Sequence, residues 1–482
     1  MILKGYLFSV LYALICLAFA FVLYKVGVPK KITRKIVHIL VGFEWVILYH
    51  FMYPTAHFLV VCLMFFAVLL VAYRKKLMPM IASDGENSPG TVYYGLAMSI
   101  MGVLLLIDSR FILPFGIGVF CTSFGDGFAG LVGQSIASSW NFKVYKNKSI
   151  VGAVTNFLVC LTVVLFFRKY FGMDLLIWQC VLIAILALEL ELFTGYGLDN
   201  ITITLGSSLL AYSFIYIDGI SNYIVPIMLT PLIIAFANRK RALTISGIVA
   251  AIIVDIIISM SLGNFGFVIL FSFFVGGIVV DKIKKKVKKQ RQKSDFLEKK
   301  GDCRDHVQVL VNSLVAAICA MAYVFTDDRI FVIGFVAALA EAFADTVASG
   351  IGVLRGKAFD IFRMKPCTPG LSGGMSVVGT SASLIGALII SLIAFAFGKI
   401  SIVEIAIITV AAFLGGIFDS LLGSLVQVKY KCSICETITE REEHCGQSTT
   451  KYRGIFFVNN DTVNLFGTIF AAALAILVVI IV

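Results

Sequence analysis

The sequence predicts an all-α fold: a polytopic bundle of about 16 transmembrane helices, arranged in two eight-span halves. Of the 482 residues, 60% are hydrophobic and only 14% are charged, whereas a soluble domain carries about 25% charged residues. The mean hydropathy is +0.98. The apolar residues fall in stretches of roughly 17–25, the length of a helix that spans a bilayer. These observations exclude a water-soluble globular enzyme.

The apolar stretches divide the chain into its expected spans. They begin near residues 5, 36, 55, 91, 111, 149, 175, 201, 220, 243, 264, 306, 331, 373, 401 and 462. The first stretch contains Ala18-Phe19-Ala20, which resembles a signal-peptidase site, but its apolar run is long and further spans follow. We therefore interpret it as an uncleaved first span.

The basic residues predict the orientation of these spans. The loops after odd-numbered spans hold 34 of the 40 Lys and Arg residues. Because short loops rich in Lys and Arg stay in the cytoplasm, we expect the odd-numbered loops to face it and both termini to lie outside. We expect a multi-pass membrane protein, located in the plasma membrane if the source is prokaryotic, with its active sites on the cytoplasmic face.

The net charge of +12 is concentrated between Lys282 and Lys300, which hold ten basic residues and two acids. Such a segment is solvated and attracts the anionic head groups of membrane lipids. No aromatic stacking platform accompanies it, so we expect no nucleic-acid partner.

Each half carries the pattern D-x-x-A-x-x-x-G in its fifth span. The pattern begins at Asp126 in the half formed by residues 1–218 and at Asp345 in the half formed by residues 219–482. The small residues allow another helix to approach closely. Helix packing does not explain an aspartate, however, because a carboxylate is costly at membrane depth and is by default a functional candidate.

The first half places further polar residues at the same membrane face. A divalent cation needs carboxylates and phosphate oxygens need cations, and phosphoryl transfer depends on positioning these charges. A helix N-terminus also favours phosphate. The candidate catalytic residues are Asp126, Lys148 and Asp199, with Asp126 or Asp199 as the base. The candidate Mg²⁺ ligands are Asp126, Glu191 and Asp199, and the candidate nucleotide-binding residues are Arg34, Lys35, His38, Ser149, Gly152 and Asn200.

The second half repeats this chemistry with different residues. A Gly-rich loop, residues 369–376, allows backbone amides to surround a phosphate; a plain flexible loop is the alternative interpretation. The candidate catalytic residues are Asp345 and Asp419, and Asp461 joins them as a candidate Mg²⁺ ligand. The candidate nucleotide-binding residues are Arg304, Gln308, Asn312, Ser372, Gly373, Gly374, Asn460 and Asn464.

The last cytoplasmic loop contains a small Cys/His knuckle at residues 429–453. Three thiols and an imidazole, from Cys432, Cys435, His444 and Cys445, can form a closed tetrahedral zinc site of the structural type. The alternative is a hairpin with free, reduced cysteines. Six of the eleven cysteines lie inside apolar spans, so no disulfide framework is expected.

The motifs of the first half resemble the phytol kinase and dolichol kinase family. They are R-K-x-x-H, G-D-G-x-A-x-x-x-G, K-S-x-x-G and E-x7-D-N-x-T, and they cover roughly residues 30–205. The resemblance implies an integral membrane kinase that phosphorylates an isoprenoid alcohol with a nucleoside triphosphate, typically CTP, and Mg²⁺.

The second half resembles a family of integral membrane proteins that includes phytyl-phosphate kinase. The matching stretches are R-D-H-V-Q-V, A-D-T-V-A-S, S-G-G-M-S-V-V-G-T, D-S-L-L-G and N-N-D-T-V-N. Together the two resemblances imply a bifunctional kinase that makes a prenyl monophosphate and then the diphosphate. Its partners would be isoprenoid alcohols, prenyl phosphates and membrane lipids. A cytidylyltransferase that makes a CDP-lipid and a lipid or isoprenoid transporter are the alternatives.

Overall fold

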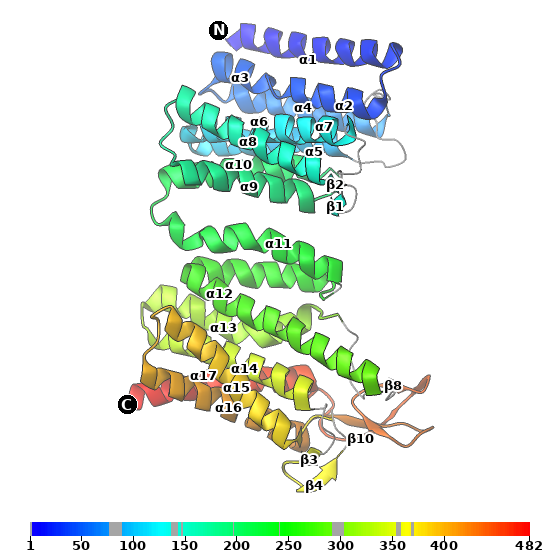
Figure 1. Cartoon of the computed structure of the whole chain (residues 1–482), viewed down its shortest axis with the longest axis vertical. Coiled ribbons are helices and arrows are strands. Elements are labelled where there is room, and N and C mark those ends of the chain that lie inside the picture. The colour runs from blue at the N-terminus through cyan, green and yellow to red at the C-terminus, as the bar shows by residue number, and fades with distance from the viewer. Residues whose placement is uncertain are drawn as a thin grey trace. The chain divides into compact units, whose positions relative to one another are not determined.

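The computed structural model divides the chain into two compact units, Met1–Ile220 and Ser221–Val482, which are described separately. The division lies two residues from the boundary expected between the halves. The described residues are 2–76, 89–135, 143–145, 148–195, 197–240, 242–291, 303–352, 358–367 and 371–482. Helices dominate both units and strands are short (Figure 1). The prediction of an all-α polytopic membrane protein is confirmed.

Unit 1 consists of helices and one small two-stranded ribbon. Its elements are α1 (Ile2–Lys25), α2 (Lys30–Val41), α3 (Glu44–Met52), α4 (His57–Arg74), α5 (Gly90–Ile107), η1 (Ser109–Phe111), α6 (Ile112–Phe120), η2 (Cys121–Asp126), α7 (Gly127–Ser135), β1 (Lys143–Tyr145), β2 (Lys148–Ser149), α8 (Ile150–Tyr170), α9 (Ile177–Phe193) and α10 (Asp199–Tyr216). The short element η3 (Ile220–Tyr223) follows at the boundary between the units.

The span formed by η1, α6, η2 and α7 is the centre of unit 1. Small residues allow α10 to approach its backbone: a Cβ on Gly118 would lie 2.2 Å from the Thr204 carbonyl oxygen. The segment η2 is a π-helix, and such segments in α-helices occur mostly at functional sites. Asp126 is its last residue, so the change of helical geometry occurs where this carboxylate projects.

Unit 2 has its small sheets beside one end of its helices (Figure 1). Its helices are α11 (Ile224–Lys240), α12 (Ile245–Arg291), α13 (His306–Thr326), α14 (Ile330–Gly352), α15 (Val377–Ala396), α16 (Ile402–Leu425) and α17 (Asn460–Ile481). Its strands are β3 (Ala358–Asp360), β4 (Lys365–Cys367), β5 (Gly374–Met375), β6 (Lys429–Lys431), β7 (Ile438–Thr439), β8 (Glu443–His444), β9 (Gln447–Ser448) and β10 (Thr450–Arg453).

Helix α12 is a hairpin of two helical arms. Gly263 has φ 60° and ψ −145° within it, a conformation that suits glycine. A Cβ on Gly247 would lie 2.5 Å from the Arg304 carbonyl oxygen, and a Cβ on Gly277 would lie 2.6 Å from the Arg304 guanidinium. On a straight helix these two glycines would be about 45 Å apart. The chain therefore reverses at Gly263 and passes Arg304 twice.

The number of spans differs from the sixteen expected. Among the described residues, thirteen helices are long and apolar enough to cross a membrane. Helix α9 has only 17 residues, and neither it nor α10 is among the thirteen. Both arms of α12 count as one helix in that number. The sixteen-span count therefore stays a prediction, and the difference arises at these three helices.

The two units share one local arrangement around their D-x-x-A-x-x-x-G motifs. Ser149 caps α8 by accepting a hydrogen bond from the Gly152 amide at 3.2 Å. Ser376 caps α15 in the same way, accepting from the Gly379 amide at 3.1 Å. Each cap satisfies one of the free amides that a helix N-terminus presents.

At these caps, the two units also share the same close approach between helices. A Cβ on Gly152 would lie 3.2 Å from the Ala129 carbonyl oxygen, and a Cβ on Gly379 would lie 3.2 Å from that of Ala348. Ala129 and Ala348 each follow the motif aspartate by three residues. The faint sequence repeat therefore corresponds to one packing geometry used twice.

The predicted topology can be tested by labelling introduced cysteines in intact cells. We expect a membrane-impermeant maleimide to label position 327 of a D327C variant, because the turn after α13 should face outward. It should leave position 294 of an S294C variant unlabelled, because the basic segment 282–300 should be cytoplasmic. Peptide mapping separates these sites from the native thiols. Labelling of position 294 before the cells are opened would contradict the orientation.

Candidate active sites

Three carboxylates that are distant in sequence meet in unit 1. Asp126 ends η2, Glu191 lies near the end of α9, and Asp199 begins α10. One oxygen atom from each lies within 4.8 Å of the others, and Asp126 and Glu191 are buried. Like charges this close repel one another in a low-dielectric environment, so the cluster needs cations.

Two lysines supply part of this compensation. The Lys35 ammonium lies 2.5 Å from Asp126 Oδ1. The Lys148 ammonium forms an ion pair with Glu191 and lies 3.8 Å from Asp199 Oδ2. Two positive charges face three negative ones, so one net negative charge remains when His38 is neutral.

The cluster also has oxygen atoms without a partner. The second Glu191 oxygen, Oε2, and the amide oxygen of Asn200 are buried and accept no hydrogen bond among the described residues. Mg²⁺ prefers oxygen ligands and is usually held by one or two carboxylates together with substrate phosphates. The donor atoms present therefore fit a magnesium–nucleotide complex.

His38 and Arg34 lie on the α2 face that carries Lys35. The His38 Nε2 atom lies 3.2 Å from the Thr122 carbonyl oxygen and 3.6 Å from Asp126 Oδ2. Arg34 lines the same cavity as His38 and Asp126. One face of α2 thus presents further basic side chains, Arg34 and His38, toward the carboxylates.

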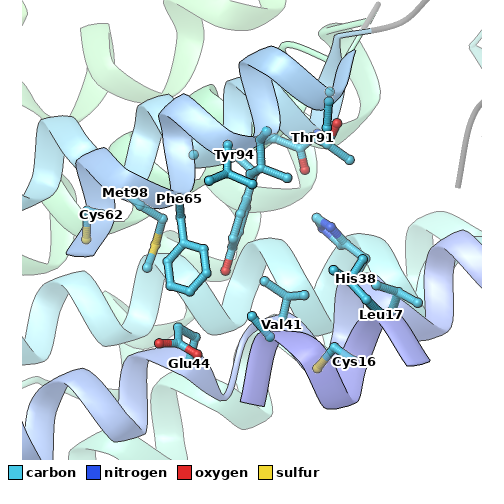
Figure 2. Close-up of a pocket in the computed structure, with 18 of the residues that line it drawn as sticks. Cys16, Leu17, His38, Val41, Glu44, Cys62, Phe65, Thr91, Tyr94 and Met98 are labelled. Atoms are coloured by element: carbon cyan, nitrogen blue, oxygen red, sulfur yellow. The ribbon is translucent and has the colours of Figure 1, made fainter. Parts of the chain in front are cut away.

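A large apolar cavity opens onto this cluster. Its volume is about 870 Å³, and α1, α2, α4 and α5 supply most of its wall. Its polar lining includes Arg34, Lys35, His38, Asp126, Asp199 and Asn200. Apolar and sulfur-containing side chains such as Leu17, Val41, Phe65 and Met98 line the region shown in Figure 2.

Glu44 is a cavity residue that the sequence analysis missed. It begins α3 and is 5% exposed, and its Oε1 atom has no partner among the described residues. Figure 2 shows Glu44 and His38 on either side of the Tyr94 ring. The signal in the sequence was a single acid inside an apolar stretch.

Unit 2 also gathers carboxylates at its centre. Asp345 lies on α14 and Asp419 on α16, as expected from their motifs. Glu341, one turn before Asp345, joins them. A Cβ on Gly467 of α17 would lie 2.6 Å from Glu341 Oε1 and 3.4 Å from the Asp419 Cβ. Glu341 is 1% exposed, and its oxygen Oε1 has no hydrogen-bond partner among the described residues.

Sequence analysis missed Glu341 because it lies in an otherwise apolar run, without a motif of its own. Its position four residues before Asp345, on the same helix face, is the signal that could have found it. In the described part of unit 2, no Lys, Arg or His forms an ion pair with Glu341, Asp345 or Asp419. This cluster is therefore compensated less than the one in unit 1.

A hydrogen-bond chain connects Asp419 to the Gly-rich loop. With its amide nitrogen facing Asp419, Asn464 donates to Asp419 Oδ2 at 3.2 Å and to the Asn460 carbonyl oxygen at 2.9 Å. The Asn460 side chain in turn accepts from the Ser372 hydroxyl at 3.1 Å. Asp461 lies beside them in the first turn of α17 and is partly exposed.

The Gly-rich loop lies against the end of α16. Gly373 has φ 85°, and a Cβ there would lie 2.6 Å from the Ser424 amide nitrogen. Gly374 pairs with Asp360 in the sheet formed by β3, β4 and β5. Of the expected loop, residues 369 and 370 lie outside the described residues.

Buried Lys429 also contacts this loop, and its ammonium donates to the Ser372 carbonyl oxygen at 2.5 Å. Burial, with a smaller contribution from Arg453, lowers the pKa of Lys429 to about 8.

Arg304, Gln308 and Asn312 lie elsewhere in unit 2. They line a small cavity of about 100 Å³ between α11, α12 and α13. Gln308 closes a capping box with Asp305, and Asn312 donates to the Gln308 carbonyl oxygen. Among the described residues, no hydrogen bond or ion pair connects them to Asp345 or Asp419. Their nucleotide-binding role stays a prediction.

The four residues of the Cys/His knuckle come together. One atom from each of Cys432, Cys435, His444 and Cys445 lies within 4.8 Å of the others. In the described part of the chain, the knuckle is one of two groups of side chains placed closely enough to hold a metal ion, and the carboxylates of unit 1 are the other.

Comparisons with known proteins support the assignment of this chain as a membrane protein. No solved structure matches this chain. The phytol kinase of a Synechocystis strain is 31% identical over 199 residues, which are 39% of this chain and 82% of that kinase. The chloroplastic protein VTE6 of Arabidopsis thaliana is 24% identical over 263 residues, 53% of this chain and 69% of that protein.

An uncharacterized membrane protein of Methanocaldococcus jannaschii is 27% identical over 259 residues, 53% of this chain and 93% of that protein. Residues 228–472 match the family of integral membrane proteins called DUF92. Since this match covers half of the sequence, the chain belongs to the DUF92 family of integral membrane proteins.

Proposed function

We propose that unit 1 phosphorylates a long-chain isoprenoid alcohol with a nucleoside triphosphate. The observation that carries this proposal is the junction of two environments: a cluster of three carboxylates and two lysines lies at the polar end of an 870 Å³ apolar cavity. Pockets for small molecules hold roughly 300–1,000 Å³. The cavity can hold the apolar chain of the alcohol while the hydroxyl group of the alcohol lies against the charged cluster.

The residues of the cluster have distinct tasks in this proposal. Asp126, Glu191 and one carboxylate oxygen of Asp199 would hold the magnesium complex of the donor, and the ion would neutralise charge on the transferred phosphate. Lys35 and Lys148 turn toward phosphate oxygens. Asp199 is the better base for the alcohol proton, because its contact to Lys148 is 3.8 Å, whereas Lys35 lies 2.5 Å from Asp126.

Two further observations support an isoprenoid substrate. The relatives include a phytol kinase, of which this chain covers 82%. The motifs that resemble the phytol kinase and dolichol kinase family contain Lys35, Asp126, Lys148, Glu191 and Asp199, and these five side chains form the cluster. We propose CTP as the donor, from this resemblance.

We propose that unit 2 adds a second phosphate to the prenyl monophosphate. One of its carboxylates, Asp419, is connected to the Gly-rich loop through Asn464 and Asn460. A phosphate acceptor is already nucleophilic, so this step needs no base comparable to Asp199. A prenyl monophosphate is amphipathic and stays in the membrane between the two sites.

The division of labour between the units can be tested by replacing one aspartate in each. Asp126→Asn should lower alcohol phosphorylation by more than the 10–100-fold typical of groups that support a metal ligand, yet still convert supplied prenyl monophosphate to diphosphate. Asp345→Asn should make monophosphate and accumulate it. The measurement uses purified protein, γ-labelled donors and farnesol, geranylgeraniol or phytol, with products separated by phosphate number.

Matched controls for this pair are Asp108→Asn and Asp255→Asn, the same substitution outside each cluster. Asp108 pairs with Arg110, and Asp255 accepts from Thr230 and Ser259. Both controls should keep both steps. Equal loss of both steps in folded Asp126→Asn and Asp345→Asn would show one composite site and contradict two kinases.

If the cavity holds the substrate chain, its size should limit the length of the isoprenoid alcohol that the enzyme accepts. Met98→Trp adds volume inside the cavity, so kcat/KM for geranylgeraniol should fall at least tenfold relative to that for farnesol. Val103→Trp is the control, because Val103 lies on the same helix and is 46% exposed. An equal loss with both alcohols in Met98→Trp, or the same change of preference in Val103→Trp, would contradict the assignment of the cavity.

A further inference from the structure

The Cys/His cluster is formed by the tips of two hairpins. Cys432 and Cys435 lie in the turn between β6 and β7, and His444 and Cys445 lie at the turn between β8 and β9. Consecutive side chains on a strand point to opposite faces. Cys445 has φ 53°, and this left-handed turn allows neighbouring His444 and Cys445 to face the same point.

The distances within the cluster match a tetrahedral zinc site. Zn–S bonds of about 2.3 Å and Zn–N bonds of about 2.0–2.1 Å place two sulfurs about 3.8 Å apart and a sulfur and a nitrogen about 3.5 Å apart. The Cys445 and Cys435 sulfurs lie 3.8 Å apart. His444 Nδ1 lies 3.4 Å from the Cys435 sulfur and 3.3 Å from that of Cys445.

Besides the cluster, the described residues show one side-chain hydrogen bond between the two tips, in which the Ser433 hydroxyl donates to Gln447 Oε1 at 3.5 Å. The strands of the hairpins are two to four residues long, and Cys435 and Cys445 are exposed. Modules of fewer than about 40 residues usually need a disulfide or a metal to fold. A direct Cys435–Cys445 disulfide would require the sulfurs to move from 3.8 Å to about 2.0 Å, and it would leave Cys432 and His444 without a role.

The same hairpins hold the Gly-rich loop. Glu440, which follows β7, accepts a hydrogen bond from the Ser372 amide at 2.7 Å. Lys429 of β6 donates to the Ser372 carbonyl oxygen at 2.5 Å, and Gln427 donates to its hydroxyl at 3.1 Å. All three polar groups of Ser372 thus contact the chain that forms the two hairpins or leads into them.

We propose that Cys432, Cys435, His444 and Cys445 bind one Zn²⁺, and that this ion holds the hairpins whose Lys429 and Glu440 fix Ser372. The site is closed and structural, with four protein ligands. In the rest of unit 2, the bound ion keeps the Gly-rich loop ordered. Metal content and loop order can both be measured without knowing which reaction unit 2 performs.

The first measurement is the metal content of the full-length protein, purified in detergent without chelators. We expect one zinc per chain in the native protein and in the thiol control Cys303→Ser, and less than about a tenth of that amount in Cys435→Ser. Absence of stoichiometric zinc from the native protein, or a Cys435–Cys445 disulfide identified by mass spectrometry, would overturn the zinc site.

The second measurement is hydrogen exchange of the peptide that contains residues 371–376. We expect exchange at Ser372 to accelerate at least tenfold when a chelator removes zinc from the native protein, a test that needs no variant to fold. Glu440→Ala should accelerate the same exchange while keeping one zinc per chain, which separates the contact from the ion. Unchanged exchange after complete removal of zinc would overturn the link between the ion and the loop.

Discussion

Carboxylates buried among membrane helices are the constraint on which both units depend. A charge at this depth is expensive unless cations or hydrogen-bond donors compensate it. Unit 1 meets the cost with Lys35 against Asp126 and Lys148 against Glu191. Together with the contact of Lys148 to Asp199, these ion pairs require the middle of α2, the end of η2, the end of α9, the start of α10 and β2 to meet. The charged cluster therefore constrains how these elements are arranged, in addition to their apolar packing.

The two units differ in how they compensate the charge of their buried carboxylates. The crossing of α7 with α8 in unit 1 and of α14 with α15 in unit 2 uses equivalent glycines and capping serines. Glu341, Asp345 and Asp419, in contrast, have no basic ion-pair partner in the described part of unit 2. Such a cluster requires protons or a bound cation to be stable. A repeated scaffold with different charge compensation fits two sites that act on different acceptors.

Much of the site in unit 1 could be predicted because polar residues inside apolar spans are rare and carry a clear signal. Asp126 stood out in this way, Glu191 and Asp199 were expected at the same membrane face, and the structure brings the three together. Glu341 had the same character but no surrounding motif. The wall of the cavity could not be predicted, since residues such as Leu17 and Met98 look like lipid-facing residues. The reversal at Gly263 falls beside residue 264, near which a new span was expected to begin.

The position of a label shows whether the terminal phosphate of the donor is transferred to the alcohol. Purified full-length protein is incubated with geranylgeraniol and CTP that carries the label in either its γ- or its α-phosphate. A kinase transfers only the γ-phosphate, so the extracted lipid should contain γ-label and no α-label. Lipid that contains the α-label would show transfer of a nucleotidyl group and would contradict the account.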